Sequence, residues 1–440
     1  MSVTTGTFPG IRIVDMPDLG AVTAASSFVG ERAGSGRFSA AALSDYVIPW
    51  TSVRTHGARG DGIANDTAAI TAAANAMPAT GGVLFFPPGN YNVSGSTALK
   101  NNTYVFGPGA TVIGLPAASW PGGNLMECFL SSGVSNITID ALTFSWPRGL
   151  ANFGSAGTAH IIEFRNSTRI EVLNCVANGG GDMVALLGCI DTLIAGCRAT
   201  NFSNAAYDHW AGAKDARVIG NYAYSDPLET HVGMGAINFT GLNTDLTPAV
   251  TSGFLCSDNF VYINNPGASG INLNGHETGG EVSKGIIANN KIVAATTVGA
   301  WGILVNGMAS NVSVHHNYLE GSNSFSAVAA LAPARSIQIE HNTAAGWNSV
   351  AGYGIFSNTS VGRTLMFNRA IDCNQPVWVS SGADVTTMLA GNDNGSGTIS
   401  IENLALTNLV NAASDAAAAA AGVPVGLLYR NGSVIQMRIV

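Results

Sequence analysis

The chain has 440 residues, of which only 10% are charged, with 54 glycines and a hydrophobic fraction of 46%. Ordinary globular domains carry roughly 25% charged residues, so this composition favours strands and tight turns over solvated helices. The net charge of −8 would repel phosphate backbones and anionic membranes, which argues against nucleic acid as a partner. The N-terminus lacks a basic segment followed by an apolar one, and no window reaches the roughly 18 apolar residues of a membrane span. We therefore expect no signal peptide, no membrane insertion and folding in a cytoplasm.

The six cysteines show no CxxC or His-paired spacing, and a secreted disulfide scaffold would be shorter and denser in cysteine. We expect buried thiols, no metal and no cofactor. The cysteines are Cys128, Cys175, Cys189, Cys197, Cys256 and Cys373.

The first ordered elements are expected at residues 57–114. The stretch GARGDGIANDTAAI (57–70) lacks the Lys-Ser/Thr ending of a phosphate loop and the alternating acids and closing Glu of a calcium loop. We interpret it as the turn before an alanine-rich helix at 66–77, for which Asn65, Asp66 and Thr67 offer capping side chains. Apolar strands follow at 81–93 and 103–114. A helix laid across the open end of a stack of strands prevents another chain from adding to it.

A repeat dominates the middle of the chain. Short alternating strands are each followed by an asparagine, with gaps of 38, 31, 27, 25 and 26 residues, and Cys175 and Cys197 take the same position in earlier repeats. A second strand set lies between them at 271–275, 302–307, 327–331 and 354–358. This pattern predicts an all-β, single-stranded right-handed parallel β-helix in which side chains at equivalent positions form ladders along the axis. The repeated asparagines are Asn221, Asn259, Asn290, Asn317, Asn342 and Asn368.

The C-terminal segment differs from the repeat. Residues 415–440 read as an alanine helix, a Gly-Val-Pro stop and an Asn431-Gly432 hairpin. Because an isolated two-stranded hairpin is only marginally stable in water, this module is expected to need partner chains.

ARGDGIANDTAAI followed by GGVLFFPPGNYNV resembles the N-terminal signature of the pectate-lyase-like β-helix family, which includes many bacteriophage tailspikes. Residues 10–48 resemble the leader by which phage tail proteins attach to the particle, and residues 415–440 resemble their closing module. The resemblance implies a homotrimer in a virion or tailocin tail, bound through its N-terminus to a baseplate or tail protein. The expected organisation is a particle-attachment segment at 1–48, a parallel β-helix at 49–405 with an N-terminal cap at about 57–80, and a trimerisation cap at 406–440.

Acids and histidines are concentrated in three consecutive repeats of this charge-poor chain. They lie in the turns that follow Cys175, Cys197 and Asn221, whereas the later turns carry no acid. A longer connection at 240–253 could form a wall beside them, because insertions in solenoids map to loops on one face. We predict catalytic roles for Asp182, Asp208 and Glu229, and substrate-binding roles for His209, Trp210, Asp226, His231 and Trp301.

Two carboxylates are the minimum for glycoside hydrolysis, one as the general acid and one as base or nucleophile. Asp182 and Asp208 are one repeat apart, which suits the shorter separation of a retaining pair, and Asp182 and Glu229 are two repeats apart, which suits an inverting pair. Each residue also has a structural interpretation: Asp226 before Pro227 and Asp182 after three glycines are typical of turns. A tryptophan packs equally well in a core or on a sugar.

The resulting hypothesis is an endo-acting glycosidase that binds a bacterial surface polysaccharide, such as O-antigen or capsule. A receptor-binding adhesin without catalysis is the alternative, since an acid that binds a hydroxyl looks the same in sequence as one that protonates a glycosidic oxygen. A lyase ranks lower because Arg198, Lys214 and Arg217 are the only bases near the acidic repeats.

Overall fold

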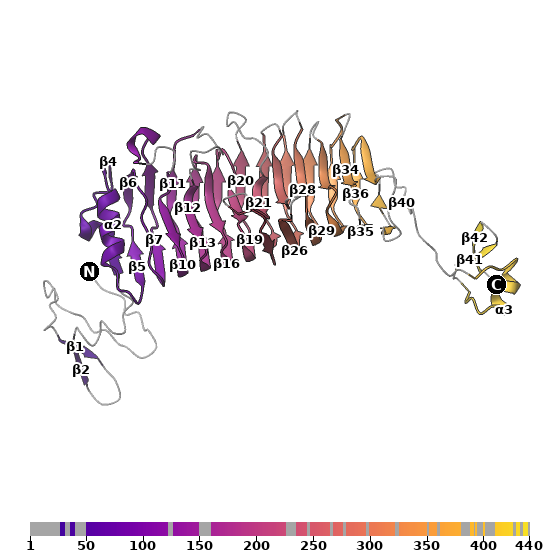
Figure 1. The fold of residues 1–440 in the computed structure, drawn as a ribbon, viewed down its shortest axis with the longest axis horizontal. Helices are drawn as coiled ribbons and strands as arrows, with labels where there is room; N and C mark the ends of the chain where they lie inside the picture. Colours follow the sequence, from indigo (N-terminus) through magenta and orange to yellow (C-terminus); the bar gives the residue numbers. More distant parts are fainter. Residues whose placement is uncertain are drawn as a thin grey trace, which may run out of the picture.

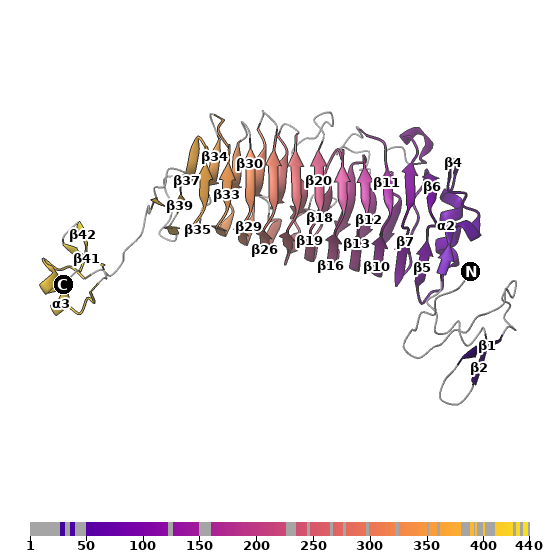
Figure 2. The same cartoon turned by 180° about the vertical axis from the view of Figure 1, so that it is seen from behind.

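The computed structural model describes residues 27–30, 36–39, 50–121, 126–148, 160–225, 235–243, 247–264, 267–275, 279–295, 299–321, 325–349, 352–358, 361–379, 388–390, 392–393, 399–400, 410–425, 428–431 and 434–438, and the structural statements below concern these residues. Three long sheets of parallel strands wrap around one core and form an elongated solenoid (Figures 1 and 2). The predicted parallel β-helix is confirmed. From β9 onwards each described coil contributes strands to all three sheets, one to each except that the coil of β21 gives the first sheet two, β22 and β23, and the coil of β37 gives the second sheet two, β39 and β40.

The first sheet consists of β3 (Trp50–Ser52), β5 (Gly82–Phe85), β7 (Thr103–Phe106), β10 (Ser135–Asp140), β13 (Thr168–Leu173), β16 (Ile190–Ala195), β19 (Lys214–Ile219), β22 (Val250–Ser252), β23 (Leu255–Ser257), β26 (Glu281–Ala288), β29 (Ala309–His315), β32 (Arg335–Glu340), β35 (Val361–Met366) and β38 (Met388–Ala390).

The second sheet consists of β4 (Asp61–Asn65), β6 (Gly89–Val93), β8 (Ala110–Gly114), β11 (Thr143–Ser145), β14 (Val176–Asn178), β17 (Arg198–Thr200), β20 (Tyr222–Ser225), β24 (Phe260–Ile263), β27 (Lys291–Ala294), β30 (Tyr318–Gly321), β33 (Thr343–Ala345), β36 (Arg369–Ile371), β39 (Asn392–Asp393) and β40 (Ile399–Ser400), the last pair being antiparallel.

The third sheet consists of β9 (Phe129–Ser132), β12 (His160–Arg165), β15 (Asp182–Leu187), β18 (Tyr207–Trp210), β21 (Gly235–Thr240), β25 (Ser269–Asn274), β28 (Trp301–Asn306), β31 (Ser326–Ala330), β34 (Tyr353–Ser357) and β37 (Gln375–Val379).

The asparagine ladder lies at the turn from the first sheet to the second. Each ladder side chain donates from Nδ2 to Oδ1 of the next asparagine, as from Asn290 to Asn317 at 2.9 Å, and the row continues to Asn392. Nδ2 also donates to a backbone carbonyl of a neighbouring coil, as from Asn290 to Cys256 at 3.0 Å. Because every buried amide is paired in this way, the ladder closes the turn without an unsatisfied polar group. Cys175 and Cys197 take the ladder positions of earlier coils, as predicted, and are buried.

The N-terminal end of the solenoid is covered by α2 (Thr67–Ala76), which buries Ile70, Ala73 and Ala74 against the core (Figure 1). Asp66 holds the preceding loop by accepting hydrogen bonds from the backbone N–H groups of Arg59 and Gly60. Asp61 accepts from the backbone N–H groups of Ile63 and Ala64. Both aspartates of the glycine-rich stretch therefore satisfy backbone donors of the loop, but Asp66 makes no side-chain hydrogen bond to α2, so its predicted capping role is wrong: its carboxylate is taken up by the loop N–H groups.

The remaining elements are short. They are β1 (Ser27–Gly30) paired with β2 (Gly36–Ser39), the 3-10 helices η1 (Val53–His56) and η2 (Ala117–Ser119), α3 (Asp415–Ala420), and the antiparallel hairpin of β41 (Leu428–Asn431) and β42 (Val434–Met437). The helix and hairpin expected near the C-terminus are both present. Within the described residues no helix is long and apolar enough to cross a membrane.

The third sheet differs from the other two in its burial. Strands of the first sheet alternate between buried and accessible residues, as in β13, whereas every residue of β15 and β21 is buried. The outward-facing side chains of the third sheet are therefore removed from bulk water, which is unusual for polar residues without a specific purpose.

Candidate active site on the outer face of the third sheet

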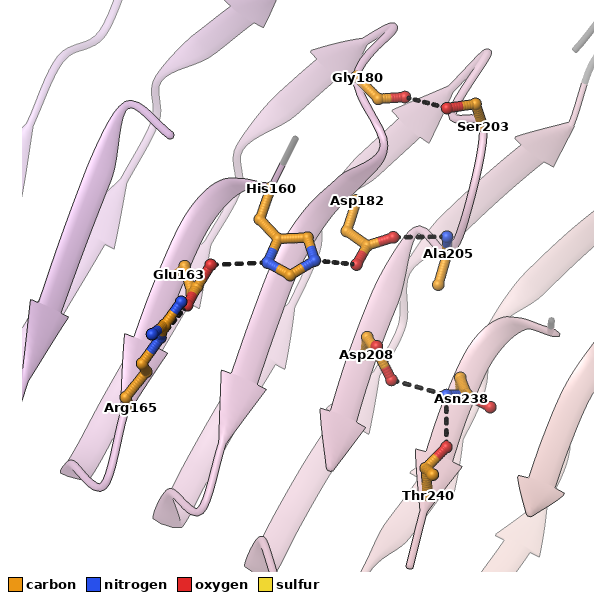
Figure 3. A network of polar contacts seen from close by, with 10 residues as sticks. All are labelled: His160, Glu163, Arg165, Gly180, Asp182, Ser203, Ala205, Asp208, Asn238 and Thr240. Atoms are coloured by element: carbon orange, nitrogen blue, oxygen red, sulfur yellow. Dashed lines mark hydrogen bonds and ion pairs between the residues drawn. The ribbon is translucent and has the colours of Figure 1, made fainter. Parts of the chain in front are cut away.

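Ionisable and amide side chains lie in a row across β12, β15, β18 and β21 (Figure 3), and Asn272 of β25 extends it. On β12, Ile161 and Ile162 both pack into the core, so the usual alternation is interrupted and His160 and Glu163 lie on the same side of the strand. The parallel register places His160 beside Asp182, and Asp208 beside Asn238. Chain segments more than 70 residues apart thus contribute to one row.

His160 bridges two carboxylates. Its Nδ1 lies 2.7 Å from Glu163 Oε2, and its Nε2 forms an ion pair with Asp182 Oδ2 at 3.0 Å (Figure 3). Burial alone would lower the pKa of His160, but the charge and hydrogen bond of Asp182, together with Glu163, raise it to about 10. His160 is therefore an imidazolium at neutral pH, in which both ring nitrogens carry a proton.

Glu163 and Asp182 have further partners. Arg165, whose side chain is about half exposed, donates from Nε to Glu163 Oε1. Although burial would raise the pKa of Glu163, the hydrogen bond from His160 and the guanidinium of Arg165 lower it below its usual value. Asp182 accepts a hydrogen bond of 2.7 Å from the backbone N–H of Ala205. Glu163 and Asp182 thus each contact the central imidazolium and one further donor.

Asp208 behaves differently from the neighbouring acids. Burial, followed by the negative charge of Asp182, raises its pKa to about 7. Its side chain accepts a hydrogen bond of 2.7 Å from Asn238 Nδ2, which also donates to Thr240 (Figure 3). Asn272 extends the row by donating to Asn238 Oδ1 at 2.9 Å. A carboxyl group that is half protonated near pH 7 is suited to general acid catalysis.

The predicted catalytic residues Asp182 and Asp208 are thus brought together, but not in turns as expected. Asp182 begins β15 and Asp208 is the second residue of β18, because the third sheet starts directly after those connections. Glu229, Asp226 and His231 lie outside the described residues. The connection at 240–253, predicted to form a wall beside the acidic repeats, begins at the end of β21. In it Leu242 and Pro248 form an antiparallel bridge.

The other predicted substrate contacts have different surroundings. His209 faces the core: it is fully buried, stacks on Phe239 with ring centroids 5.2 Å apart, and lies 3.2 Å from Thr192 Oγ1. Strand alternation, which places Asp208 outward, turns His209 inward, so we leave it out of the site. Trp210 is two residues beyond Asp208 and partly buried. Trp301 begins β28, in the row of Asp182 but four strands away, and packs on Phe325.

Sequence reasoning missed His160, Glu163 and Asn238. The strand HIIEFR carries three ionisable residues in a chain with 10% charge, which is a usable signal. Residues three apart in a regular strand face opposite sides, however, so a contact between His160 and Glu163 could not be expected from the sequence.

Two buried polar groups beside the row have no partner. Both side-chain atoms of Asn204, which is 1% exposed, lack a hydrogen bond, and so does Nε1 of Trp210. Native proteins rarely leave such groups unpaired without a function or a bound molecule. Among the described residues, no group of three or more His, Cys, Asp or Glu side chains is arranged to hold a metal ion.

A hollow of about 440 Å³ lies elsewhere, on the first sheet, with Lys284, Asn311 and Gln338 among its lining residues. Its lining contains hydroxyl, amide and lysine side chains but no carboxylate or histidine. It therefore lacks an acid and base pair, and the row on the third sheet is the better candidate for catalysis.

The N-terminal region of the chain is similar in sequence to known proteins. Residues 50–127 match the family model described as rhamnogalacturonase A/epimerase, pectate lyase-like. A segment of 66 residues is 43% identical to mannuronan C5-epimerase AlgE5 of Azotobacter vinelandii, and it covers 13% of this chain and 7% of that protein. The match thus spans a small part of the relative.

Solved structures share the fold over a longer stretch. A tailspike protein of E. coli bacteriophage HK620, solved in complex with a pentasaccharide, aligns over 81% of this chain and 67% of its own with a TM-score of 0.60 and 14% identity. A family 28 exopolygalacturonase of Yersinia enterocolitica aligns over 80% of both chains with a TM-score of 0.58 and 12% identity. Residues 50–127 therefore carry a pectate lyase-like domain, and the coils that follow continue the same right-handed parallel β-helix.

Proposed function

We propose that this protein binds a bacterial surface polysaccharide on the outer face of its third sheet and hydrolyses it as an endo-glycosidase. The observation that carries the proposal is the contrast between acids on two neighbouring strands: burial raises the pKa of Asp208 to about 7, whereas Asp182 forms an ion pair with His160 and accepts a hydrogen bond from the backbone N–H of Ala205. Pairs of carboxyl groups with opposite protonation are what glycoside hydrolysis requires.

In this proposal Asp208 donates its proton to the glycosidic oxygen as the bond to the anomeric carbon breaks. Asp182 supplies the negative charge on the other side, as the base that activates water or as the nucleophile. His160 and Glu163 position Asp182 rather than contact the substrate. After cleavage, Asp208 regains a proton that comes from water, so that the net reaction consumes one water molecule for each glycosidic bond broken.

The extended face supports action within a chain of sugars. Trp301 lies in the row of Asp182 four strands away, about 19 Å at a strand spacing of about 4.8 Å. An indole offers a flat apolar surface for a sugar ring. The distance corresponds to several sugar residues, which supports an endo-acting mode over removal of single terminal sugars.

The resemblance to tailspikes also suggests an oligomeric state and a location for this protein. We propose a homotrimer in a phage or tailocin tail, attached through residues 1–48 and closed by residues 406–440. The fold shared with the tailspike of bacteriophage HK620 supports a place in a phage tail, and the pentasaccharide bound to that tailspike supports sugar binding. The molar mass of the full chain by light scattering tests the trimer, and a monomer would contradict it.

The experiment that tests the activity is incubation of the full chain with surface polysaccharides from a panel of Gram-negative strains. We expect shorter chains by gel and new reducing ends, without the ultraviolet absorbance of the unsaturated sugar that a lyase produces. Asp208→Asn should lower the rate by about a hundredfold to ten-thousandfold, whereas Asp258→Asn, at an exposed turn on another edge, should not. New reducing ends that persist in Asp208→Asn would overturn the catalytic assignment.

A second candidate is an adhesin that binds without cleavage. The specific observation in its favour is that Asp182 and Asp208 are both at most 1% exposed and already hydrogen-bonded, so that they could simply hold the floor of a binding face. Binding to one polysaccharide without shortening it would establish this function.

A further inference from the structure

Along the sequence, the acidic residues are concentrated in the segments that form and connect the strands of the third sheet. Its strands, and the connections that enter and leave them between residues 115 and 379, contain nine Asp and Glu residues but only two basic residues, Arg148 and Arg165. This amounts to −7 of the net −8, and the rest of the chain is almost neutral, with 17 basic and 18 acidic residues. The charge asymmetry thus lies in these segments of the sequence and is not spread evenly along the chain.

The cations within the row are already compensated. His160 lies between Glu163 and Asp182, and Arg165 is bonded to Glu163. A sugar carboxylate bound at this face would find, among the described side chains of the row, no cation without a carboxylate partner. Burying an anion without a partner is strongly unfavourable, and a negative field also slows its approach.

The groups that do lack partners beside the row are neutral. The Asn204 amide offers both a donor and an acceptor, and Trp210 Nε1 offers a donor. Asn204 directly precedes Ala205, whose N–H donates to Asp182, and Trp210 follows Asp208 by two residues on the same strand. A sugar hydroxyl both donates and accepts, so it matches an unpaired amide in a way that a carboxylate does not.

We infer that the third sheet takes an uncharged sugar chain, with Asn204 and Trp210 as hydrogen-bonding residues beside the two carboxyl groups. The inference rests on the proposed function and narrows its substrate class: neutral hexoses, deoxyhexoses and acetamido sugars fit, whereas polyuronates do not. A site that prefers negatively charged polyuronates would need cationic side chains on this face to bind their carboxylates.

The test uses the full chain and polysaccharides sorted into uncharged and uronate-containing sets. We expect binding and cleavage only in the uncharged set, with an affinity that changes little between low and high salt. When the primary hydroxyls of a neutral polymer that binds are oxidised to carboxylates, the dissociation constant should rise by about a hundredfold. Binding of a uronate polymer that weakens with added salt would overturn the inference and leave the proposed function intact. Failure to bind any polymer of either set would overturn the proposed function, and this inference with it.

Two substitutions test the named residues. Asn204→Ala should weaken binding by about tenfold, the effect of losing one or two hydrogen bonds, while the melting temperature stays the same or rises, because the amide has no partner in the free protein. Trp210→Phe, which removes Nε1 and keeps a ring, should weaken binding in the same direction. Gln338→Ala on the exposed first sheet serves as the control. If Asn204→Ala lowers the melting temperature and leaves the affinity unchanged, the residue is structural and this assignment is wrong.

Discussion

Two rows of buried polar side chains run along this solenoid, and they are built on different principles. The asparagine ladder repeats one neutral side chain from Asn221 to Asn392 and pairs each amide with the next. The row on the third sheet places different residues on successive strands, carries charge, and has unpaired groups beside it. Repetition with full pairing serves stability, whereas unlike residues with shifted pKa values and unpaired atoms indicate a functional site.

The largest effect is expected in the ladder. Asn342→Ala removes four side-chain hydrogen bonds, to Val314 and Asn368 and from Asn317. At about 1 to 1.5 kcal/mol each, the free energy of unfolding should fall by about 4 to 6 kcal/mol. Denaturant unfolding followed by circular dichroism measures the change. Asn358→Ala, which removes one hydrogen bond at an accessible turn, is the control, and an equal effect in both variants would contradict a cooperative ladder.

The next effect concerns the centre of the charged row. His160→Gln leaves Glu163 and Asp182 without the cation between them, and breaking a buried ion pair in this way costs about 3 to 5 kcal/mol. Because the pKa of His160 is raised from 6.5 to about 10, its stabilisation is fully present below pH 6.5 and is lost as the pH rises through 10. The difference in unfolding free energy between wild type and His160→Gln should therefore shrink across this range. A difference that does not depend on pH would show that His160 is not charged.

A smaller effect is expected at Asp208. Because its pKa is raised from 3.8 to about 7, its protonated form stabilises the fold below pH 3.8, and this contribution is lost as the pH rises through 7. Asp208→Asn should remove that loss of stability, so that wild type becomes less stable relative to the variant as the pH rises, by up to about 4 kcal/mol at about 1.4 kcal/mol per pH unit. Melting temperatures of both proteins between pH 4 and 8 measure it. Parallel curves would mean that Asp208 is not protonated at neutral pH.

The smallest effect is expected at His209, one residue further along the same strand. Burial lowers its pKa to about 3, so it is neutral and packs as a ring in the core. His209→Phe loses one hydrogen bond and keeps the ring, so the unfolding free energy should change by no more than about 1 kcal/mol. Binding to the polysaccharide should be unchanged. A tenfold loss of binding would return His209 to the site.

Much of the fold was predictable because the solenoid repeats. The spacing of Asn221 through Asn368, the inward Cys175 and Cys197, and the capping helix at 67–76 each depend on contacts within one coil or between adjacent coils. Such contacts leave a local pattern in the sequence, and so do the alternating strands of the three sheets. The concentration of acids near Asp182 and Asp208 was visible for the same reason.

The composition of the site was decided by the tertiary structure. A count along the chain could not tell that His160 and Glu163 share a face, because consecutive core residues interrupt the alternation of β12. Nor could it distinguish Asp208 from His209, since one residue of register determines which side chain faces outward and which packs in the core. The coil, its ladders and the region rich in acids could be predicted from the order of the residues alone, because these features repeat or accumulate locally. Only the folded chain decided which groups touch, and therefore which acid keeps its proton, because pKa values depend on burial and on neighbours brought together from separate coils.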